Sequence, residues 1–185
     1  MTHADDLQAV SVDEALIDVT SSVARIRTDL AERSGDVEDS VDPAKDFAEA
    51  IRAQVRKVTG CEVSIGIASN IMLARLASRR AKPAGSFHLR AEDVAEFLAP
   101  LDIDDLHGFG HSARQKAADK LGATNLGELM TKSKATLCEA LGKGVGETLY
   151  KALRGIDERR LESDKPRKSV SCDINVSLVL CAAVW

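Results

Sequence analysis

The sequence predicts an α+β unit over residues 1–91, followed by an all-helical unit over residues 92–163. Two short segments, residues 10–20 and 63–67, are rich in β-branched residues, as strands commonly are. Beyond residue 92 the chain consists of short helical stretches separated by glycines, and no strand pattern is present. The 185 residues, of which 44% are hydrophobic, are enough for one ordinary domain or two small ones with a buried core.

The α+β unit is expected to begin with a strand, a turn and a second strand within residues 10–20. Residues 21–43 are polar and acidic, which favours a loop or an insertion. Residues 44–58 are expected to form a helix, because their apolar residues recur at helical spacing. The apolar face of this helix consists of Phe47, Ile51, Val55 and Val58.

A second strand–helix–strand pattern completes the α+β unit. Residues 63–67 read as a short buried strand, and Ser69 or Asn70 is expected to cap a helix that continues to about residue 81. A proline and a glycine soon afterwards end this helix. Residues 86–89 are expected to form an edge strand.

The all-helical unit is expected to contain five short helices, at residues 93–98, 112–121, 125–130, 134–141 and 145–153. Residues 164–185 are expected to combine a basic linker with an apolar tail unrelated to the two units. The apolar run at residues 176–185 is too short to span a bilayer, so we expect no membrane association. The first ten residues contain acids and no apolar run, so no secretory signal is expected.

Charge and cysteine usage exclude several classes of protein. The chain carries 25 basic and 29 acidic residues, so a uniformly basic nucleic-acid coat is excluded. Residues 1–46 carry four basic and twelve acidic residues, and the mildly basic remainder could face an anionic partner. Aromatic residues make up 3% of the chain and supply few platforms for stacking bases. The four cysteines form no C-x-x-C pair, which argues against a disulfide scaffold or a zinc site: Cys61, Cys138, Cys172 and Cys181.

The first candidate site is the acidic turn, residues 11–14, which reads Ser11-Val12-Asp13-Glu14. Adjacent carboxylates on a regular strand point to opposite faces, so Asp13 and Glu14 converge only if they lie at a turn. There they could hold Mg²⁺, which prefers oxygen ligands. The alternative is an ordinary pair of solvated acids.

The second candidate is the strand-to-helix connection at residues 66–70 together with Lys82, which precedes a proline. A glycine bend and a helix N-terminus can approach a phosphate, and Lys82 is well placed to contact one. The alternative is an ordinary β–α connection. Arg75 and Arg79 on the helix are expected to form a solvated stripe, with contact to a DNA backbone as the second interpretation.

The third candidate is the first hairpin, residues 106–112, which resembles a helix–hairpin–helix. Gly108 and Gly110 permit positive φ and leave backbone N–H groups open to a phosphate, and Phe109 is expected to fix the hairpin in the core. Ser112 is expected to cap the next helix. Further candidate contacts to nucleic acid are His111, Arg114, Lys116 and Lys120.

Such a site contacts backbone and not bases, so its binding is expected to be independent of sequence and sensitive to salt. The alternative is a simple glycine turn. Residues 142–146, the second hairpin, read as a weaker version of the same motif. His107 and His111 are expected to have a packing or capping role. In the linker, Arg167 and Lys168 are expected either to follow phosphates or to belong to a solvated tether.

Taken together, these segments resemble the Y-family of translesion DNA polymerases. Ser11-Val12-Asp13-Glu14-Ala15 is similar to the S-x-D-E-A motif of that family. The other matching segments are residues 63–89 (palm), 101–121 (thumb hairpin), 153–157 (thumb exit) and 167–171 (tether to the little finger). The resemblance covers about residues 7–176, and within the family it points to the deoxycytidyl transferases.

The resemblance implies a fold, an activity and partners. The α+β unit would be an incomplete palm, and the helical unit a thumb. Asp13 and Glu14 would be carboxylates of a two-metal (Mg²⁺) phosphoryl transfer, and Lys82 would contact the triphosphate of the incoming nucleotide. The partners would be primer–template DNA, damaged DNA included, dCTP and other translesion polymerases, in the nucleus.

The sequence also departs from the family pattern. No D-x-D-x-F segment, which carries a further metal-binding aspartate, precedes Ser11, and no residue here takes the role of the arginine that pairs with dCTP. Residues 176–185 stand where a little-finger strand is expected. We therefore expect the chain alone to be inactive. The rival interpretations are a non-enzymatic module that binds duplex DNA and a fragment that does not fold stably.

Overall fold

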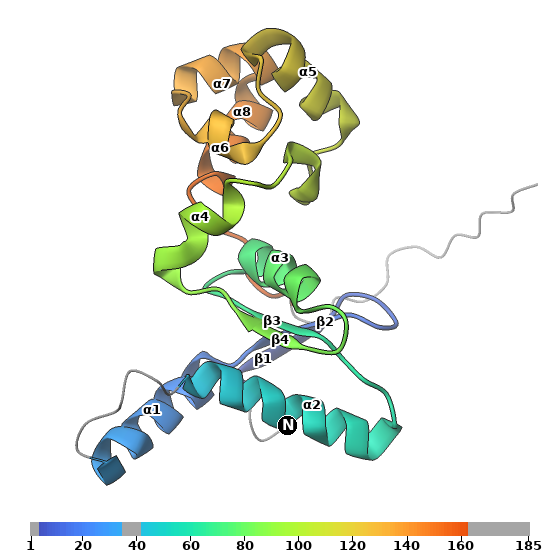
Figure 1. Cartoon of the computed structure of the whole chain (residues 1–185), viewed down its shortest axis with the longest axis vertical. Helices are drawn as coiled ribbons and strands as arrows, with labels where there is room; N and C mark the ends of the chain where they lie inside the picture. Colours follow the sequence, from blue (N-terminus) through green and yellow to red (C-terminus); the bar gives the residue numbers. More distant parts are fainter. Residues whose placement is uncertain (1–3, 35–41, 163–185) are drawn as a thin grey trace, which may run out of the picture.

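The computed structural model describes residues 4–34 and 42–162 (Figure 1). The α+β unit contains the strands β1 (Asp6–Ala9), β2 (Ala15–Asp18), β3 (Ile65–Ile67) and β4 (Ser86–His88) and the helices α1 (Thr20–Ser34), α2 (Pro43–Thr59) and α3 (Ile71–Ala81). β1 and β2 pair antiparallel, and β3 and β4 pair parallel. α2 and α3 both pack on β3 and β4, from opposite sides (Figure 1).

The helical unit follows α3 and β4 in the chain and lies beyond α3 (Figure 1). It contains the short 3₁₀ helices η1 (Ala91–Asp93) and η2 (Ile103–Asp105) and the helices α4 (Val94–Leu98), α5 (His111–Leu121), α6 (Leu126–Met130), α7 (Lys134–Leu141) and α8 (Lys143–Ala152). The predicted fold class, a mixed α+β part followed by a helical part, is confirmed. Among the described residues, no helix has both the length and the apolarity needed to cross a membrane.

The expected strand–turn–strand is present, but it lies earlier in the chain than predicted. Asp6 pairs with Asp18 and Ala9 with Ala15, so the acidic turn closes a β-hairpin. The N–H groups of Val10 and Ser11 donate to the carbonyl oxygen of Glu14, at 2.8 and 3.1 Å. The acidic turn therefore lies between two strands, as convergence of its carboxylates requires.

The prediction of a loop directly after this hairpin was wrong. α1 occupies residues 20–34, and the Asp18 carboxylate accepts a hydrogen bond from the N–H of Thr20 at 3.0 Å. Val23, Ile26 and Leu30 recur at helical spacing and are half-buried, so the apolar repeat outweighs the polar composition. Residues 35–41 lie outside the described residues.

The two longer predicted helices of the α+β unit are confirmed, with one error. α2 buries Ala44 and Ala48, whereas Val58, predicted on the apolar face, is 70% exposed. α3 is capped by Asn70, whose Oδ1 accepts from the N–H of Leu73 at 3.0 Å. α3 lies so close to β3 that a Cβ on Gly66 would be 2.0 Å from the backbone nitrogen of Ser78, so the strand needs glycine there.

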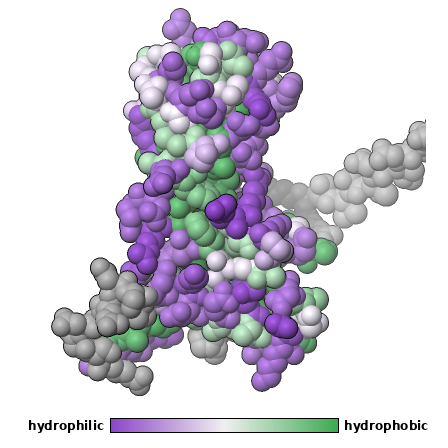
Figure 2. All heavy atoms as spheres, in the orientation of Figure 1, coloured by the Kyte–Doolittle hydropathy of each residue, from purple (hydrophilic) through white to green (hydrophobic). Residues whose placement is uncertain are grey.

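The core runs continuously from α3 into the helical unit. Buried residues of α3 belong to the same cluster as those of α4 to α8, and the side chains that are almost fully buried include Leu73, Leu98, Ile103, Leu106, Leu126, Leu129, Leu137 and Leu149. Phe87 of β4 stacks on Phe97 of α4, with ring centroids 5.7 Å apart. Figure 2 shows hydrophobic residues gathered at the middle of this face, where α3 and α4 meet, with hydrophilic residues around them.

Candidate active site and nucleic-acid interface

The acidic turn presents its two carboxylates in different environments. Asp13 is exposed, and its Oδ1 accepts a hydrogen bond from Ser11 Oγ at 2.6 Å. This hydrogen bond is the main cause of a lowered pKa of Asp13, and the nearby charge of Lys82 contributes to the lowering. The carboxylate is therefore ionised at neutral pH.

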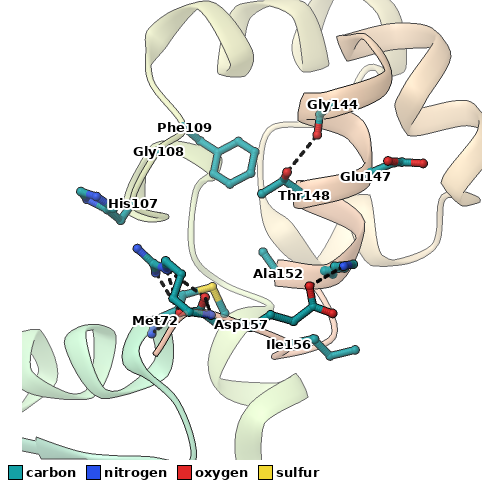
Figure 3. A pocket seen from close by; sticks show the side chains of 13 residues that line it. Met72, His107, Gly108, Phe109, Gly144, Glu147, Thr148, Ala152, Ile156 and Asp157 are labelled. Carbon is teal, nitrogen blue, oxygen red and sulfur yellow. Dashed lines mark hydrogen bonds and ion pairs between the residues drawn. The ribbon is translucent and has the colours of Figure 1, made fainter. Parts of the chain in front are cut away.

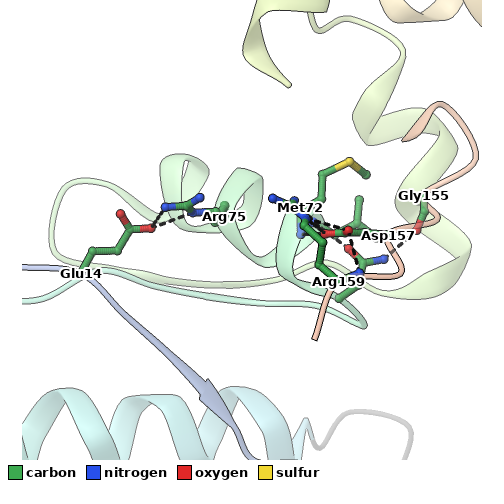
Figure 4. A network of polar contacts seen from close by, with 8 residues as sticks. Glu14, Met72, Arg75, Gly155, Asp157 and Arg159 are labelled. Carbon is green, nitrogen blue, oxygen red and sulfur yellow. Dashed lines mark hydrogen bonds and ion pairs between the residues drawn. The ribbon is translucent and has the colours of Figure 1, made fainter. Parts of the chain in front are cut away.

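Glu14 is held by an arginine on α3. Arg75 Nε and Nη2 each lie 2.8 Å from Glu14 Oε1, so two donors of the guanidinium bind the same carboxylate oxygen (Figure 4). The two residues are 61 positions apart, and the contact fixes the acidic turn against α3. Arg75 was predicted to belong to a solvated stripe, and its ion pair with Glu14 corrects that prediction.

The far end of α3 also approaches the acidic turn. Lys82, directly after α3, is exposed, and its positive charge makes a small contribution to the lowered pKa of Asp13. The structure thus links the acidic turn, which carries Asp13 and Glu14, with the separate segment that carries Arg75 and Lys82. Arg75, in the middle of α3, pairs with Glu14, and Lys82, beyond the end of α3, adds a favourable positive charge for Asp13.

The described residues do not fit a complete metal centre. Within residues 4–34 and 42–162 there is no group of three or more His, Cys, Asp or Glu side chains placed to hold a metal ion. Asp13 and Glu14 offer the oxygen ligands that Mg²⁺ prefers, but one oxygen of Glu14 is shared with Arg75. The turn can therefore contribute to a metal site and does not form one by itself.

The first hairpin has the predicted shape with two corrections. Phe109 is buried, and its N–H donates to the carbonyl oxygen of Leu106 at 3.1 Å. Gly108 has a φ of +94°, but Gly110 has an extended backbone, with φ −115° and ψ −173°. α5 begins at His111 and Gly110 occupies the cap position, so the exposed Ser112 lies within the helix and does not cap it.

The cations around the first hairpin are of two kinds. Arg114 Nη2 lies 2.9 Å from an oxygen of Asp102, and its Nη1 lies 3.1 Å from one of Asp104. Local carboxylates therefore neutralise much of its charge. Lys116 and Lys120 are exposed on the same helix as Arg114. His111, the first residue of that helix, and His107, in the hairpin before it, are also exposed. A packing or capping role was predicted for the two histidines, and their exposure contradicts the packing alternative.

The second hairpin lies across a cavity from the first. Gly142 has the same φ of +94° as Gly108, and α8 begins directly after it. A cavity of about 660 Å³ separates the two hairpins, with Gly108 and Phe109 on one wall and Gly144 on the other (Figure 3). Arg167 and Lys168, the predicted linker contacts, lie outside the described residues.

One group of functional contacts was not predicted. Asn70 Nδ2 donates to the carbonyl oxygen of Gly155 at 2.7 Å, and Asp157 Oδ2 accepts from the N–H of Met72 at 2.9 Å. In both contacts the partners are 85 positions apart. A pattern of neighbouring residues carries no signal for such pairs, although the capping role of Asn70 was predicted.

Known protein families match the chain in two consecutive segments. The impB/mucB/samB family matches residues 2–79, which contain the acidic turn and most of α3. The thumb domain of DNA polymerase iota matches residues 104–157, which contain both hairpins.

Whole proteins match over nearly the entire chain. The DNA repair protein rev1 of Schizosaccharomyces pombe is 40% identical over 174 residues, which are 94% of this chain and 17% of the relative. DNA polymerase IV of Stenotrophomonas maltophilia strain K279a is 36% identical over 173 residues, 94% of this chain and 43% of the relative. The chain thus spans less than half the length of these relatives.

Solved structures share the fold. The insertion ternary complex of Dbh DNA polymerase superposes with a TM-score of 0.67 at 27% identity, covering 87% of this chain and 42% of that one. DinB from Sulfolobus solfataricus gives a TM-score of 0.65 at 27% identity, covering 87% of this chain and 43% of that one. The predicted resemblance is therefore confirmed: the acidic turn and most of α3 lie in the impB/mucB/samB match, the first hairpin lies in the thumb-domain match that follows it, and the chain belongs to the Y-family of DNA polymerases.

Proposed function

We propose that the chain is the palm and thumb part of a translesion DNA polymerase that transfers dCMP opposite template guanine or damaged bases. The observation that carries this proposal is that α3 faces the acidic turn: Arg75 in the middle of α3 pairs with Glu14, and the charge of Lys82, directly after α3, helps to lower the pKa of Asp13. Support for the role in DNA repair comes from the rev1 relatives, which are DNA repair proteins 32–40% identical to this chain. The dCMP specificity rests on the resemblance of the sequence motifs to the deoxycytidyl transferases. The rev1 relatives also favour a nuclear location.

In this proposal the residues near α3 handle the negative charges of the reaction. Asp13 and Glu14 are the catalytic and metal-binding carboxylates, and Ser11 and Arg75 orient them. Lys82 binds the triphosphate of dCTP as a point charge. Bound Mg²⁺ would supply charge stabilisation at the transferred phosphoryl group. The chain's own contribution is a pair of ionised, oriented oxygen ligands beside a cation.

The first hairpin binds the duplex through its backbone. A Cβ at either Gly108 or Gly110 would have no neighbour within 4 Å, so a phosphate can approach the amide groups there. Buried Phe109 keeps the hairpin rigid. Around the hairpin, Arg114 and Lys116 add positive charge, and His111 and Ser112 add exposed polar groups. Arg167 and Lys168, outside the described residues, are proposed as further phosphate contacts from the sequence alone. Arg114 contributes less than a free arginine because Asp102 and Asp104 already pair with it.

The affinity for duplex DNA should depend on the absence of side chains at Gly108 and Gly110 in the first hairpin, because a phosphate approaches the backbone there. We expect Gly110→Val to weaken binding of a primer–template about fivefold to tenfold, the effect of about one lost hydrogen bond of ordinary strength. Gly110 has an extended backbone that valine adopts without strain, so this variant blocks the approach of a phosphate and leaves the fold intact. Gly108→Val should weaken binding further, because φ is positive there.

Fluorescence anisotropy across a salt series measures this effect. Affinity of the parent should fall steeply as salt increases, as phosphate contacts require. The matched control is Ala24→Val, an exposed substitution on α1, which should bind like the parent. Unchanged affinity in both glycine variants would show that the duplex is bound elsewhere.

Primer extension tests the catalytic half of the proposal. We expect the chain alone to bind DNA and to give no extension with dCTP and Mg²⁺. The described residues place two carboxylates at the acidic turn, and one of these is shared with Arg75. Addition of a single dCMP by the purified chain would contradict this expectation. DNA binding without extension also describes the alternative, a non-enzymatic duplex-binding module, in which the two hairpins alone carry the function.

A further inference from the structure

At the start of α3, each of the two units contributes a side chain that makes a hydrogen bond to the backbone of the other unit. Asn70 belongs to the α+β unit, and its amide donates to the Gly155 carbonyl oxygen in the segment that leaves the helical unit. Asp157 belongs to that exit segment, residues 153–162, and its carboxylate accepts from the Met72 N–H in the first turn of α3. The first N–H groups of a helix have no partner within the helix, so each unit supplies a cap to the same helix end.

Asp157 is held tightly in this position. Arg159 Nε and Nη2 each lie 2.8 Å from a different oxygen of the Asp157 carboxylate, and the Arg159 N–H adds a bond at 3.2 Å (Figure 4). The Asp157 side chain is 9% exposed. Burial acts to raise the pKa of Asp157, but the hydrogen bonds from Arg159 outweigh it and leave the pKa lowered. In the ionised carboxylate of Asp157, one oxygen accepts a hydrogen bond from the first turn of α3, and both oxygens accept hydrogen bonds from Arg159.

The exit segment has little freedom to move away. Gly155 has a φ of +69°, and a Cβ there would lie 2.7 Å from Val94 Cγ1, so the segment runs against α4. At the other end of α3, Arg79 Nη1 donates to the carbonyl oxygen of Asp105 at 2.9 Å. Both ends of α3 are thus fastened to the helical unit, and its middle is fastened to the acidic turn by Arg75.

We propose that Asp157 is a positioning residue, which locks the helical unit onto the first turn of α3 and so fixes the first hairpin at one distance from Asp13 and Glu14. The series of contacts runs from Asp157 to Met72, along α3 to Arg75, and from Arg75 to Glu14 (Figure 4). The consequence for DNA, that a duplex on the first hairpin is delivered to the acidic turn, rests on the proposed function. The positioning itself does not.

A distance between the two units tests this lock. Spin labels are placed at the exposed native Cys61 beyond the end of α2 and, through Lys120→Cys, in the last turn of α5. Cys138, Cys172 and Cys181 are replaced by serine. Pulsed electron paramagnetic resonance then gives the distribution of distances between the two spin labels. The parent should give one narrow population.

Loss of the lock should shift or broaden that population by more than about 2 Å, the scale of a domain rearrangement. We expect this result for Asp157→Ala and for Asn70→Ala. Asp157→Asn keeps an oxygen for the Met72 N–H and loses the arginine fork, so it should fall between Asp157→Ala and the parent. This partial rescue is a result that general destabilisation does not produce.

Asn125→Ala is the matched control. Asn125 caps α6 by accepting from the Glu128 N–H at 2.8 Å, so it has the same chemistry as Asn70 but lies wholly within the helical unit. It should leave the distance distribution narrow. An unchanged distribution in Asp157→Ala and Asn70→Ala would overturn the proposal, and so would equal broadening in Asn125→Ala. If Asp157→Ala fails to fold, the distance distributions of Asp157→Asn and Asn70→Ala still show whether the proposed positioning role is correct.

A parallel binding measurement separates this proposal from the proposed function. Duplex affinity is measured beside the distances on the parent without label or substitution, because Lys120 is itself a candidate contact to nucleic acid. A parent that does not bind the duplex contradicts the proposed function, whereas the response of the distances to Asp157→Asn still confirms or overturns the lock.

Discussion

Replacing Leu73 by alanine should destabilise both units at once, by about 2–5 kcal/mol, the usual range for a buried leucine. Leu73 is 1% exposed in the first turn of α3, and its cluster continues through Leu98 into Leu149 of the helical unit. A cavity at this position removes contacts from both sides. If the boundary predicted at residue 91 separated two independent domains, the helical unit would be unaffected.

Hydrogen exchange followed by mass spectrometry distinguishes these results. We expect faster exchange in peptides that cover α5 and α8 of the Leu73→Ala variant, in parallel with those that cover α3. The control is Ile17→Ala, since Ile17 is 41% exposed on β2 and should cost less than about 1 kcal/mol. Unchanged protection of α5 and α8, with faster exchange in α3, would show two domains that unfold separately.

Gly146→Ala should destabilise the helical unit by about 1–3 kcal/mol or more, because there is no space for a side chain. A Cβ at this position would lie 2.5 Å from the Cα and 2.6 Å from the backbone nitrogen of Cys138. These are backbone atoms of α7, so the two helices must move apart. The contact between α7 and α8 supports the second hairpin, which should lose order with it.

Gly144→Ala is a close control, because Gly144 lies two residues earlier on the same helix with no atom within 4 Å of its would-be Cβ. Alanine is the better helix former by up to about 1 kcal/mol, so this variant should be as stable as the parent or more stable. Thermal unfolding followed by circular dichroism measures both changes. A similar loss of stability in the two variants would mean that flexibility of the second hairpin, and not the close approach of α7, requires glycine.

The sequence predicted well wherever the determining interactions are local. Asn70 caps α3, α7 begins and ends where predicted, and Phe109 fixes the first hairpin, because caps, apolar repeats and glycine turns act over a few residues. α1 was missed because its acidic surroundings concealed a short apolar repeat. The family was recognised because the order of the motifs carries information that no single motif has.

The site depends on contacts between distant residues. Arg75 was expected in solvent and instead holds Glu14, since the β-hairpin folds back along α3. Arg114 was expected as a free cation and is paired with Asp102 and Asp104, which a linear charge count does not reveal. The packing alternative for His107 and His111 was wrong because the first hairpin is closed by Phe109, which leaves both histidines exposed.

The sequence by itself determined the family and the fold class, and it supplied the segments that we propose to carry the chemistry: the acidic turn, Lys82 and the first hairpin. Only the tertiary structure decided how these segments are held together. α3 is capped by both units, paired with Glu14 and buried in one common core, and each of these contacts joins residues far apart in the chain. The physical reason is that a local pattern specifies how a helix forms, whereas its partners are selected by the burial and charge that the whole fold creates.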